Sequence, residues 1–155
     1  MDNGPDLSKG KKLALKYLTR QARSRKETLD YLIRKGFDKT VSENILEYLE
    51  NLNYIDDQKL AAHYADYRKN FKKEGKIRIE QELFRKGISI EVISGVIEHL
   101  FKENEELILA KSFAKKFLLK MESQDPEKLK KKLIYKLKRK GYCDNTVLAV
   151  IKEYI

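Results

Sequence analysis

The sequence contains no tryptophan, only two prolines, seven glycines and a single cysteine among its 155 residues. Proline and glycine mark the turns between short strands, so their scarcity favours long helices over a β-sandwich or barrel. One cysteine excludes an intramolecular disulfide, which fits a reducing compartment. No apolar run approaches the ~20 residues that a membrane span requires, and residues 1–12 lack the apolar stretch of a secretion signal. We therefore expect a cytoplasmic protein that makes no membrane contact.

Motifs that carry chemistry are also missing. The sequence has no glycine-rich phosphate loop, no cysteine or histidine pair at metal-ligand spacing, and no nucleophile motif. His63 and His99 fall on different expected helices, and Cys143 is interpreted as a small loop residue. Asp56 and Asp57 are adjacent carboxylates, which helix N-capping explains without an acid–base role. We therefore expect a protein that is not an enzyme and that needs no cofactor or metal ion.

Positive charge is abundant, with 34 Lys/Arg against 24 Asp/Glu and a formal net charge of +10. Residues 9–35 carry 10 basic and 2 acidic side chains, and residues 107–155 carry 13 and 5, whereas residues 57–106 carry 10 of each. Basic zones near both ends are typical of proteins that bind nucleic acid or an acidic protein surface. A lysine-rich helix face that only serves solubility explains each zone equally well.

One tripeptide occurs three times, as Arg34-Lys35-Gly36, Arg85-Lys86-Gly87 and Arg139-Lys140-Gly141. The glycines are separated by 51 and then 54 residues, and each has a leucine four residues before it. A nearly constant period of about 50 residues indicates tandem structural repeats. Because lysine or arginine before glycine is common at helix ends, we assign the leucines and glycines to the fold.

Apolar residues at helical spacing predict three helices in each repeat. The first is expected at Lys9–Ala22, after a short flexible lead of residues 1–8. The predicted helix starts are the capping boxes Ser24-x-x-Glu27 and Thr40-x-x-Glu43, the caps Ser89 and Asp125-Pro126, and either Asp144 or Asn145 before the last helix. In the second repeat, the first two helices are expected at about Asp57–Lys73 and Lys76–Lys86. In the third repeat, the first helix is expected at Glu105–Lys120.

The predicted fold class is all-α, with three tandem three-helix repeats that form an elongated, curved helical array. The first repeat and its lead occupy residues 1–56, the second residues 57–104, and the third residues 105–155.

Three stretches resemble the RecX family of bacterial regulators of the RecA recombinase. They are Arg20-x-x-Arg23-Ser24-x-x-Glu27 with Leu32-x-x-Lys35-Gly36, then Tyr54-Ile55-Asp56-Asp57-x-x-Leu60-Ala61-x-x-Tyr64-x-x-x-Arg68, and finally Gly75-x-x-Arg78-Ile79-x-x-Glu82-Leu83-x-x-Lys86-Gly87-Ile88. The third stretch is the most specific. Thr28 departs from the family pattern, which has leucine directly after the glutamate, and beyond residue 100 the resemblance is mainly one of spacing.

The resemblance implies a monomeric, non-enzymatic protein of DNA repair and the SOS response that binds RecA and the RecA–DNA filament. Such a protein inhibits the ATPase, strand-exchange and coprotease activities of RecA by blocking filament extension or promoting disassembly. Weak direct binding to DNA is a further implication. Two other interpretations stay open: a sequence-tolerant DNA-binding protein built from helix-turn-helix-like units, and a helical scaffold for another partner.

Basic residues are the expected contacts with RecA or DNA, because guanidinium and ammonium groups recognise carboxylates and phosphates. Helix-end charge complementation is the alternative for Lys35, Lys86 and Lys140. Tyrosines at helical spacing, such as Tyr17 and Tyr31, are interpreted as core-edge residues, with base stacking as the alternative. The predicted contacts are Arg20, Arg23, Arg25, Arg34 and Lys35 near one end, Arg68, Arg78, Arg85 and Lys86 in the centre, and Lys130, Lys131, Lys132, Lys136, Arg139 and Lys140 near the other end.

Overall fold

The computed structural model describes residues 4–122 and 125–155, and every regular element within these ranges is an α-helix. We call the successive groups of three helices units 1, 2 and 3. Unit 1 contains α1 (Gly4–Arg20), α2 (Arg25–Arg34) and α3 (Lys39–Asn51). Unit 2 contains α4 (Asp57–Asn70), α5 (Lys76–Arg85) and α6 (Ile90–Leu100), and unit 3 contains α7 (Glu105–Lys120), α8 (Pro126–Arg139) and α9 (Asp144–Tyr154).

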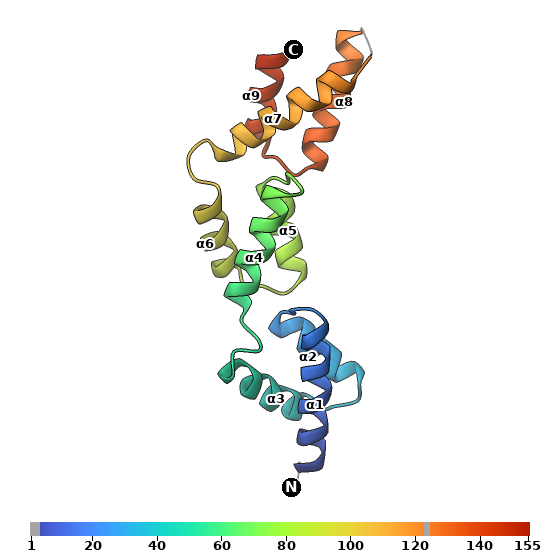
Figure 1. The fold of residues 1–155 in the computed structure, drawn as a ribbon, viewed down its shortest axis with the longest axis vertical. Helices are drawn as coiled ribbons and strands as arrows, with labels where there is room; N and C mark the ends of the chain where they lie inside the picture. Colours follow the sequence, from blue (N-terminus) through green and yellow to red (C-terminus); the bar gives the residue numbers. More distant parts are fainter. Residues whose placement is uncertain (1–3, 123–124) are drawn as a thin grey trace.

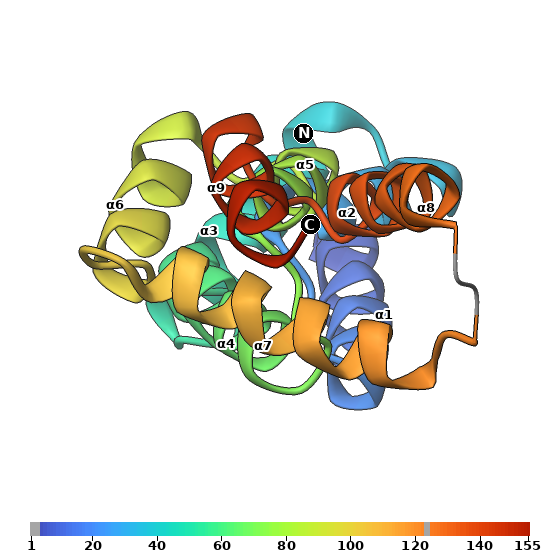
Figure 2. The same ribbon diagram turned by 90° about the horizontal axis from the view of Figure 1, so that it is seen from above.

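The three units follow one another along the long axis of the molecule (Figure 1). Each unit has its own core, built mainly from its second and third helices on the small residues of its first. Corresponding core positions in the third helices are occupied by Leu46, Ile97 and Ile151, all of which are buried. The predicted all-helical repeat fold is therefore confirmed. Viewed along the long axis, α2 and α8 project toward the same side of the molecule (Figure 2).

Most of the predicted helix starts are confirmed. Ser24 forms a capping box with Glu27, and the side chains of Ser89 and Asp125 cap α6 and α8. The repeat glycines have φ values of 96°, 81° and 87°. Each therefore takes the left-handed conformation directly after a helix, which glycine adopts at little steric cost.

Three expectations about where helices begin were wrong. Helix α1 begins at Gly4 and absorbs most of the expected lead, because proline is tolerated in a first helical turn. Residues 1–3 of that lead lie outside the described ranges. Asp38 caps α3 in place of Thr40, since its carboxylate accepts a 2.8 Å hydrogen bond from the backbone N–H of Val41. Cys143, without a side-chain capping bond, precedes α9 in place of Asp144 or Asn145.

Within the described ranges, no helix has both the length and the apolar character needed to cross a membrane. The same residues contain no group of three His, Cys, Asp or Glu side chains arranged to hold a metal ion.

Candidate protein-interaction surface

The Arg-Lys-Gly turn of unit 2 docks on the first turn of α2. The Ser24 hydroxyl donates a hydrogen bond to the backbone carbonyl of Lys86, and the Lys86 ammonium lies 4.0 Å from the Glu27 carboxylate. Beside them, the backbone N–H of Arg25 donates a 2.8 Å hydrogen bond to Asp57 at the start of α4. Burial is the main reason that the pKa of Asp57 is raised. These contacts form the joint between units 1 and 2.

The turn of unit 3 docks on the start of α5 at the corresponding positions. The backbone N–H of Gly75 donates a 2.8 Å hydrogen bond to the carbonyl of Lys140. The next backbone N–H, that of Lys76, donates a 2.9 Å hydrogen bond to Glu106 near the start of α7. Gly75 and Lys76 occupy the positions in unit 2 that Ser24 and Arg25 occupy in unit 1, counted from the repeat glycine. The two joints are therefore built in the same way.

Glycine is required in both joints because the two units approach closely there. A Cβ atom at Gly87 would overlap the side chain of Lys26, and a Cβ atom at Gly141 would overlap the backbone and Cβ of Arg78. At Gly36, by contrast, no atom of the described residues lies within 4 Å of the corresponding position. The first copy of the tripeptide is therefore the open one.

Arg68 and Arg78 both contact one buried carboxylate of unit 2, and Arg78 also reaches across the second joint. Glu74 is only 3% exposed, and its Oε1 atom lies 3.4 Å from Nη1 of Arg68 and 3.2 Å from Nε of Arg78. Arg68 also donates a 3.1 Å hydrogen bond to the Tyr64 hydroxyl, and Arg78 donates one of 2.9 Å to the carbonyl of Arg139. Both arginines are thus engaged inside the molecule.

Two further predicted contacts are engaged in the same way. The Arg25 guanidinium bridges α2 and α3, with Nη2 2.5 Å from Glu43 and Nε 2.7 Å from Glu50, and these hydrogen bonds raise its pKa. Lys140 donates a 2.7 Å hydrogen bond to the carbonyl of Lys72, and partial burial lowers the pKa of its ammonium.

The predicted cations that stay accessible in unit 1 gather at one place. Arg20 of α1 and Arg34 and Lys35 at the end of α2 line a pocket of about 530 Å³, and Lys16 joins them from the preceding turn of α1. The remaining lining residues are Leu13, Tyr17 and Tyr31, so the pocket itself is lined by no carboxylate. We call this site the unit-1 basic pocket.

A pair of tyrosines forms the floor of the unit-1 basic pocket. The Tyr17 and Tyr31 rings stack with their centroids 4.0 Å apart and their planes within 1° of parallel. The Arg23 guanidinium lies 5.0 Å from the Tyr17 centroid, and it also pairs with Glu27 at 3.4 Å. Among the described residues, the four lysines and arginines of the pocket make no ion pair. The pocket is therefore a positively charged and partly aromatic site.

Sequence reasoning missed Lys16. A signal was present, since Lys16 and Arg20 are four residues apart and lie on the same face of a helix.

The other predicted cations that stay accessible lie on the second helices of units 2 and 3. Lys131, Lys132, Lys136 and Arg139 are exposed on α8, and Lys130 is half-buried where α8 faces α9. Arg85 is exposed and pairs with Glu82 at 2.7 Å, a surface contact that contributes little energy. The fifteen predicted residues thus fall into three groups. Arg78, Lys86 and Lys140 contribute to the joints, Arg23, Arg25 and Arg68 make contacts within their own units, and the other nine lie at the surface.

Comparison with known proteins places the chain in one family. Residues 11–49 match the family model described as "RecX, first three-helix domain", and residues 56–97 match "RecX, second three-helix domain". Regulatory protein RecX of Bacillus licheniformis is 31% identical over 150 residues, which cover 97% of this chain and 57% of the relative. Regulatory protein RecX of Clostridium perfringens strain SM101 is 31% identical over 144 residues, which cover 90% and 67%. The chain thus spans little more than half of the Bacillus relative's length.

Solved structures agree with the sequence matches. The crystal structure of RecX from Lactobacillus salivarius superposes with a TM-score of 0.84, at 26% identity and 96% coverage of both chains. A second crystal structure, of regulatory protein RecX, gives a TM-score of 0.83 at 27% identity, covering 95% of this chain and 73% of the other. The two matching domains, the shared repeat architecture and the relatives together show that this chain belongs to the RecX family.

Proposed function

We propose that this chain binds RecA and its nucleoprotein filament, and that it inhibits the ATPase, strand-exchange and coprotease activities of RecA. The observation that carries the proposal is the unit-1 basic pocket, which presents four unpaired cations beside an open Arg-Lys-Gly turn. Membership of a family of regulatory proteins supports a protein partner. The inhibition acts through blocked filament extension or promoted disassembly in the cytoplasm.

The extended arrangement of the units supports a filament as the target. Three units joined end to end can contact several neighbouring subunits of a polymer, and each further contact is then intramolecular. Modest individual interfaces become a stable complex on the filament, whereas a single free subunit is held weakly. A monomeric, elongated chain can therefore bind along a RecA filament.

The proposed contacts are the predicted cations that internal contacts leave accessible, together with Lys16. Arg78, Lys86 and Lys140 instead position the units. Arg23, Arg25 and Arg68 are engaged with carboxylates of their own unit. The proposed contacts are Lys16, Arg20, Arg34 and Lys35 of the pocket, Arg85 on α5, and Lys130, Lys131, Lys132, Lys136 and Arg139 on α8.

The test measures RecA ATPase activity on single-stranded DNA while this chain is added at substoichiometric amounts. In the triple variant Arg20→Gln, Arg34→Gln, Lys35→Gln, we expect the half-inhibiting concentration to rise about tenfold or more, a change of about 1.4 kcal/mol. Glutamine keeps the helix propensity of the replaced residues, so helicity should not change.

A matched control removes the same charge elsewhere. The triple variant Lys12→Gln, Lys39→Gln, Lys116→Gln replaces three exposed lysines outside the pocket, and it should inhibit like the native chain. Equal inhibition by both triple variants would remove the pocket from the interface. No inhibition by the native chain at any ratio would overturn the proposed function.

Direct DNA binding is the second candidate, and the exposed cations of α8 favour it. A protein that neutralises phosphates loses close to one log unit of affinity per contacted phosphate for each log unit of salt. Anisotropy of labelled single-stranded DNA, measured without RecA across a salt series, decides between the two. A steep slope that the change Lys131→Gln, Lys132→Gln, Lys136→Gln flattens would establish DNA as a primary ligand.

A further inference from the structure

Unit 3 carries an apolar groove of about 820 Å³ between α8 and α9. Val147 and Ile151 are buried and form its floor. Ile134 of α8 lines one wall, while Leu148 of α9 and Ile155, which directly follows α9, line the other and are 67% and 44% exposed. Large apolar side chains that stay this accessible around a groove mark a binding surface.

The rim of the groove is basic. Lys130 and Lys138 stand on the α8 side, Lys152 stands on the α9 side, and Asp144 is the one acid among the lining residues. Among the described residues, none of these three lysines makes an ion pair. An apolar floor with three unpaired cations around it is complementary to an apolar ligand face with acidic edges.

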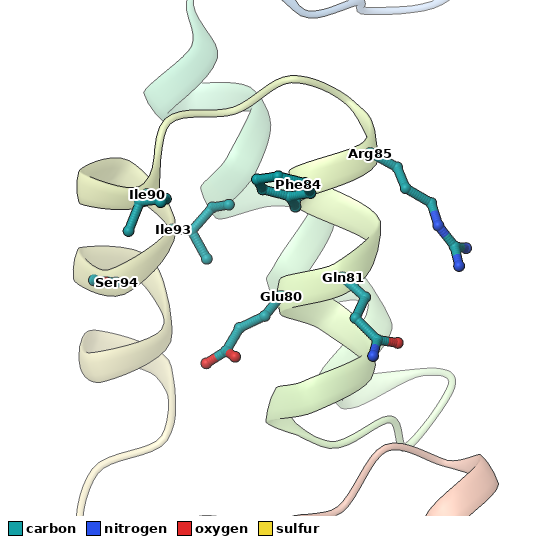
Figure 3. Close-up of a pocket in the computed structure, with 7 residues that line it drawn as sticks. All are labelled: Glu80, Gln81, Phe84, Arg85, Ile90, Ile93 and Ser94. Atoms are coloured by element: carbon teal, nitrogen blue, oxygen red, sulfur yellow. The ribbon is translucent and has the colours of Figure 1, made fainter.

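Unit 2 has a groove at the same place, between α5 and α6, with a different rim. Figure 3 shows Phe84, Ile90 and Ile93 facing one another between the two helices. Its volume is about 460 Å³, and its charged lining residues are Glu80 and Arg85. The two grooves thus share a position in the repeat, but only the unit-3 groove combines its larger volume with a strongly basic rim.

In unit 1 an ion-pair bridge crosses the corresponding place. Arg25 at the start of α2 contacts both Glu43 and Glu50 of α3. Lys130 occupies the matching position of unit 3, counted from the repeat glycine, and lines the open groove. The residue that joins α2 to α3 is therefore replaced in unit 3 by a cation available to a ligand.

The apolar row on α9 has the spacing of a helix-binding surface. Leu148, Ile151 and Ile155 are separated by three and then four residues, so they cover about 10 Å along the helix axis. A ligand helix with apolar residues at i, i+3 or i+4, and i+7 presents a row of the same length. Acidic residues beside that row would meet Lys130, Lys138 and Lys152.

We propose that the α8–α9 groove binds an amphipathic helix with acidic edges, supplied by a partner protein. Nucleic acid fits the groove poorly, because its charged phosphates would lose water against the apolar isoleucine and valine floor without forming hydrogen bonds there. A second copy of this chain fits poorly because its net charge of +10 opposes contact with a basic rim. This inference goes beyond the proposed function and does not depend on RecA.

The test uses designed peptides of about 18 residues, long enough for roughly five helical turns. The probe carries leucine at i, i+3, i+4 and i+7 with glutamate and alanine elsewhere, and binding is followed by fluorescence anisotropy. One control peptide replaces every glutamate with lysine, and the other scrambles the probe sequence. We expect the probe to bind at least about tenfold more tightly than either control, the margin of one well-placed contact.

Variants of the chain then locate the binding site. Leu148→Glu and Lys138→Glu each change an exposed side chain at the groove, and each should weaken probe binding about tenfold or more. Phe84→Glu in the unit-2 groove and Lys128→Glu, at an exposed position of α8 outside the groove, are the matched controls, and they should bind like the native chain. Circular dichroism establishes that each variant is folded.

Several outcomes would overturn the proposal. These are equal binding of the probe and the scrambled peptide, or probe binding that Leu148→Glu leaves unchanged. Another is a self-association that Leu148→Glu abolishes in analytical ultracentrifugation while the probe does not bind, which would assign the groove to a second copy. Binding to phosphatidylserine vesicles through Leu148, again without probe binding, would assign it to a lipid surface.

Discussion

Glu106 shows how one buried carboxylate organises several groups at once. It is 4% exposed near the start of α7, and it accepts hydrogen bonds from the backbone N–H of Lys76 in unit 2 and from the Thr146 hydroxyl. Cys143 and Tyr142 lie beside it. Burial first, and then the charge of Glu106, raise the pKa of the Cys143 thiol to about 11 and that of the Tyr142 phenol as well.

The raised pKa predicts an unreactive cysteine. Because the thiolate is the nucleophile, a thiol pKa of about 11 instead of 9.0 leaves about a hundredfold less thiolate at neutral pH. Iodoacetamide should therefore alkylate Cys143 about a hundredfold more slowly in the folded chain than in urea, with the rate rising up to about pH 11. Mass spectrometry of time points measures both rates.

Glu106→Gln provides the control for this prediction. It removes the negative charge that disfavours the thiolate but leaves the thiol partly buried. Alkylation of the folded variant should be faster than in the native chain and still slower than in urea. Equal rates in the folded and unfolded native chain would show that the Cys143 pKa is not raised.

At the scale of helices, the docking of the second and third Arg-Lys-Gly turns on the preceding unit is the main organising contact. The turn supplies carbonyl groups, and the first turn of α2 or α5 supplies the hydroxyl or backbone N–H groups that bond to them. The first turns of helices have free N–H groups, so the joint satisfies donors that would otherwise need a cap or water.

Two glycine variants separate backbone strain from packing. Gly36→Ala and Gly141→Ala both force alanine into a left-handed conformation, which costs about 1–2 kcal/mol. Gly141→Ala also drives a methyl group into Arg78, which adds about 1–3 kcal/mol. Urea unfolding should therefore show a greater loss of stability for Gly141→Ala. Equal losses would show that the joint tolerates the extra atom.

The sequence predicts features that depend on neighbouring residues and misses those that depend on distant ones. The Ser24 capping box and the glycine helix ends are local, and both are confirmed. The hydrogen bond from Ser24 to Lys86 joins residues 62 positions apart, and nothing in either neighbourhood indicates it. The start of α9 was misplaced for the same reason, because Glu106 of α7 satisfies groups there that a local cap would otherwise serve.

The candidate site follows the same division. Sequence reasoning named Arg20, Arg34 and Lys35, which the structure brings together in one pocket. It could not separate them from Arg78 and Lys140, which have the same charge and similar neighbours in the sequence. Only tertiary contacts show that those two cations point into a joint.

At the scale of the whole molecule, the two joints hold three small cores in an extended row (Figure 1). A compact protein of 155 residues has a radius of gyration of about 15 Å. Small-angle X-ray scattering should therefore give a clearly larger value for this chain. The value should not change with salt, because the joints depend mainly on hydrogen bonds of backbone groups and on the buried Glu106 carboxylate, which salt screens weakly.

Arg78→Ala should loosen the row while leaving the unit cores intact. The change removes a 2.9 Å hydrogen bond to the carbonyl of Arg139 and the 3.2 Å contact with Glu74, but it removes no core residue. Scattering should show greater flexibility between units 2 and 3, whereas circular dichroism should show native helicity. Arg85→Ala, on the exposed side of the same helix, is the control and should scatter like the native chain. If both variants scattered alike, the remaining backbone hydrogen bonds and the Glu106 contact would be sufficient to fix units 2 and 3. Arg78 would then have to be counted among the surface cations that are available to a partner.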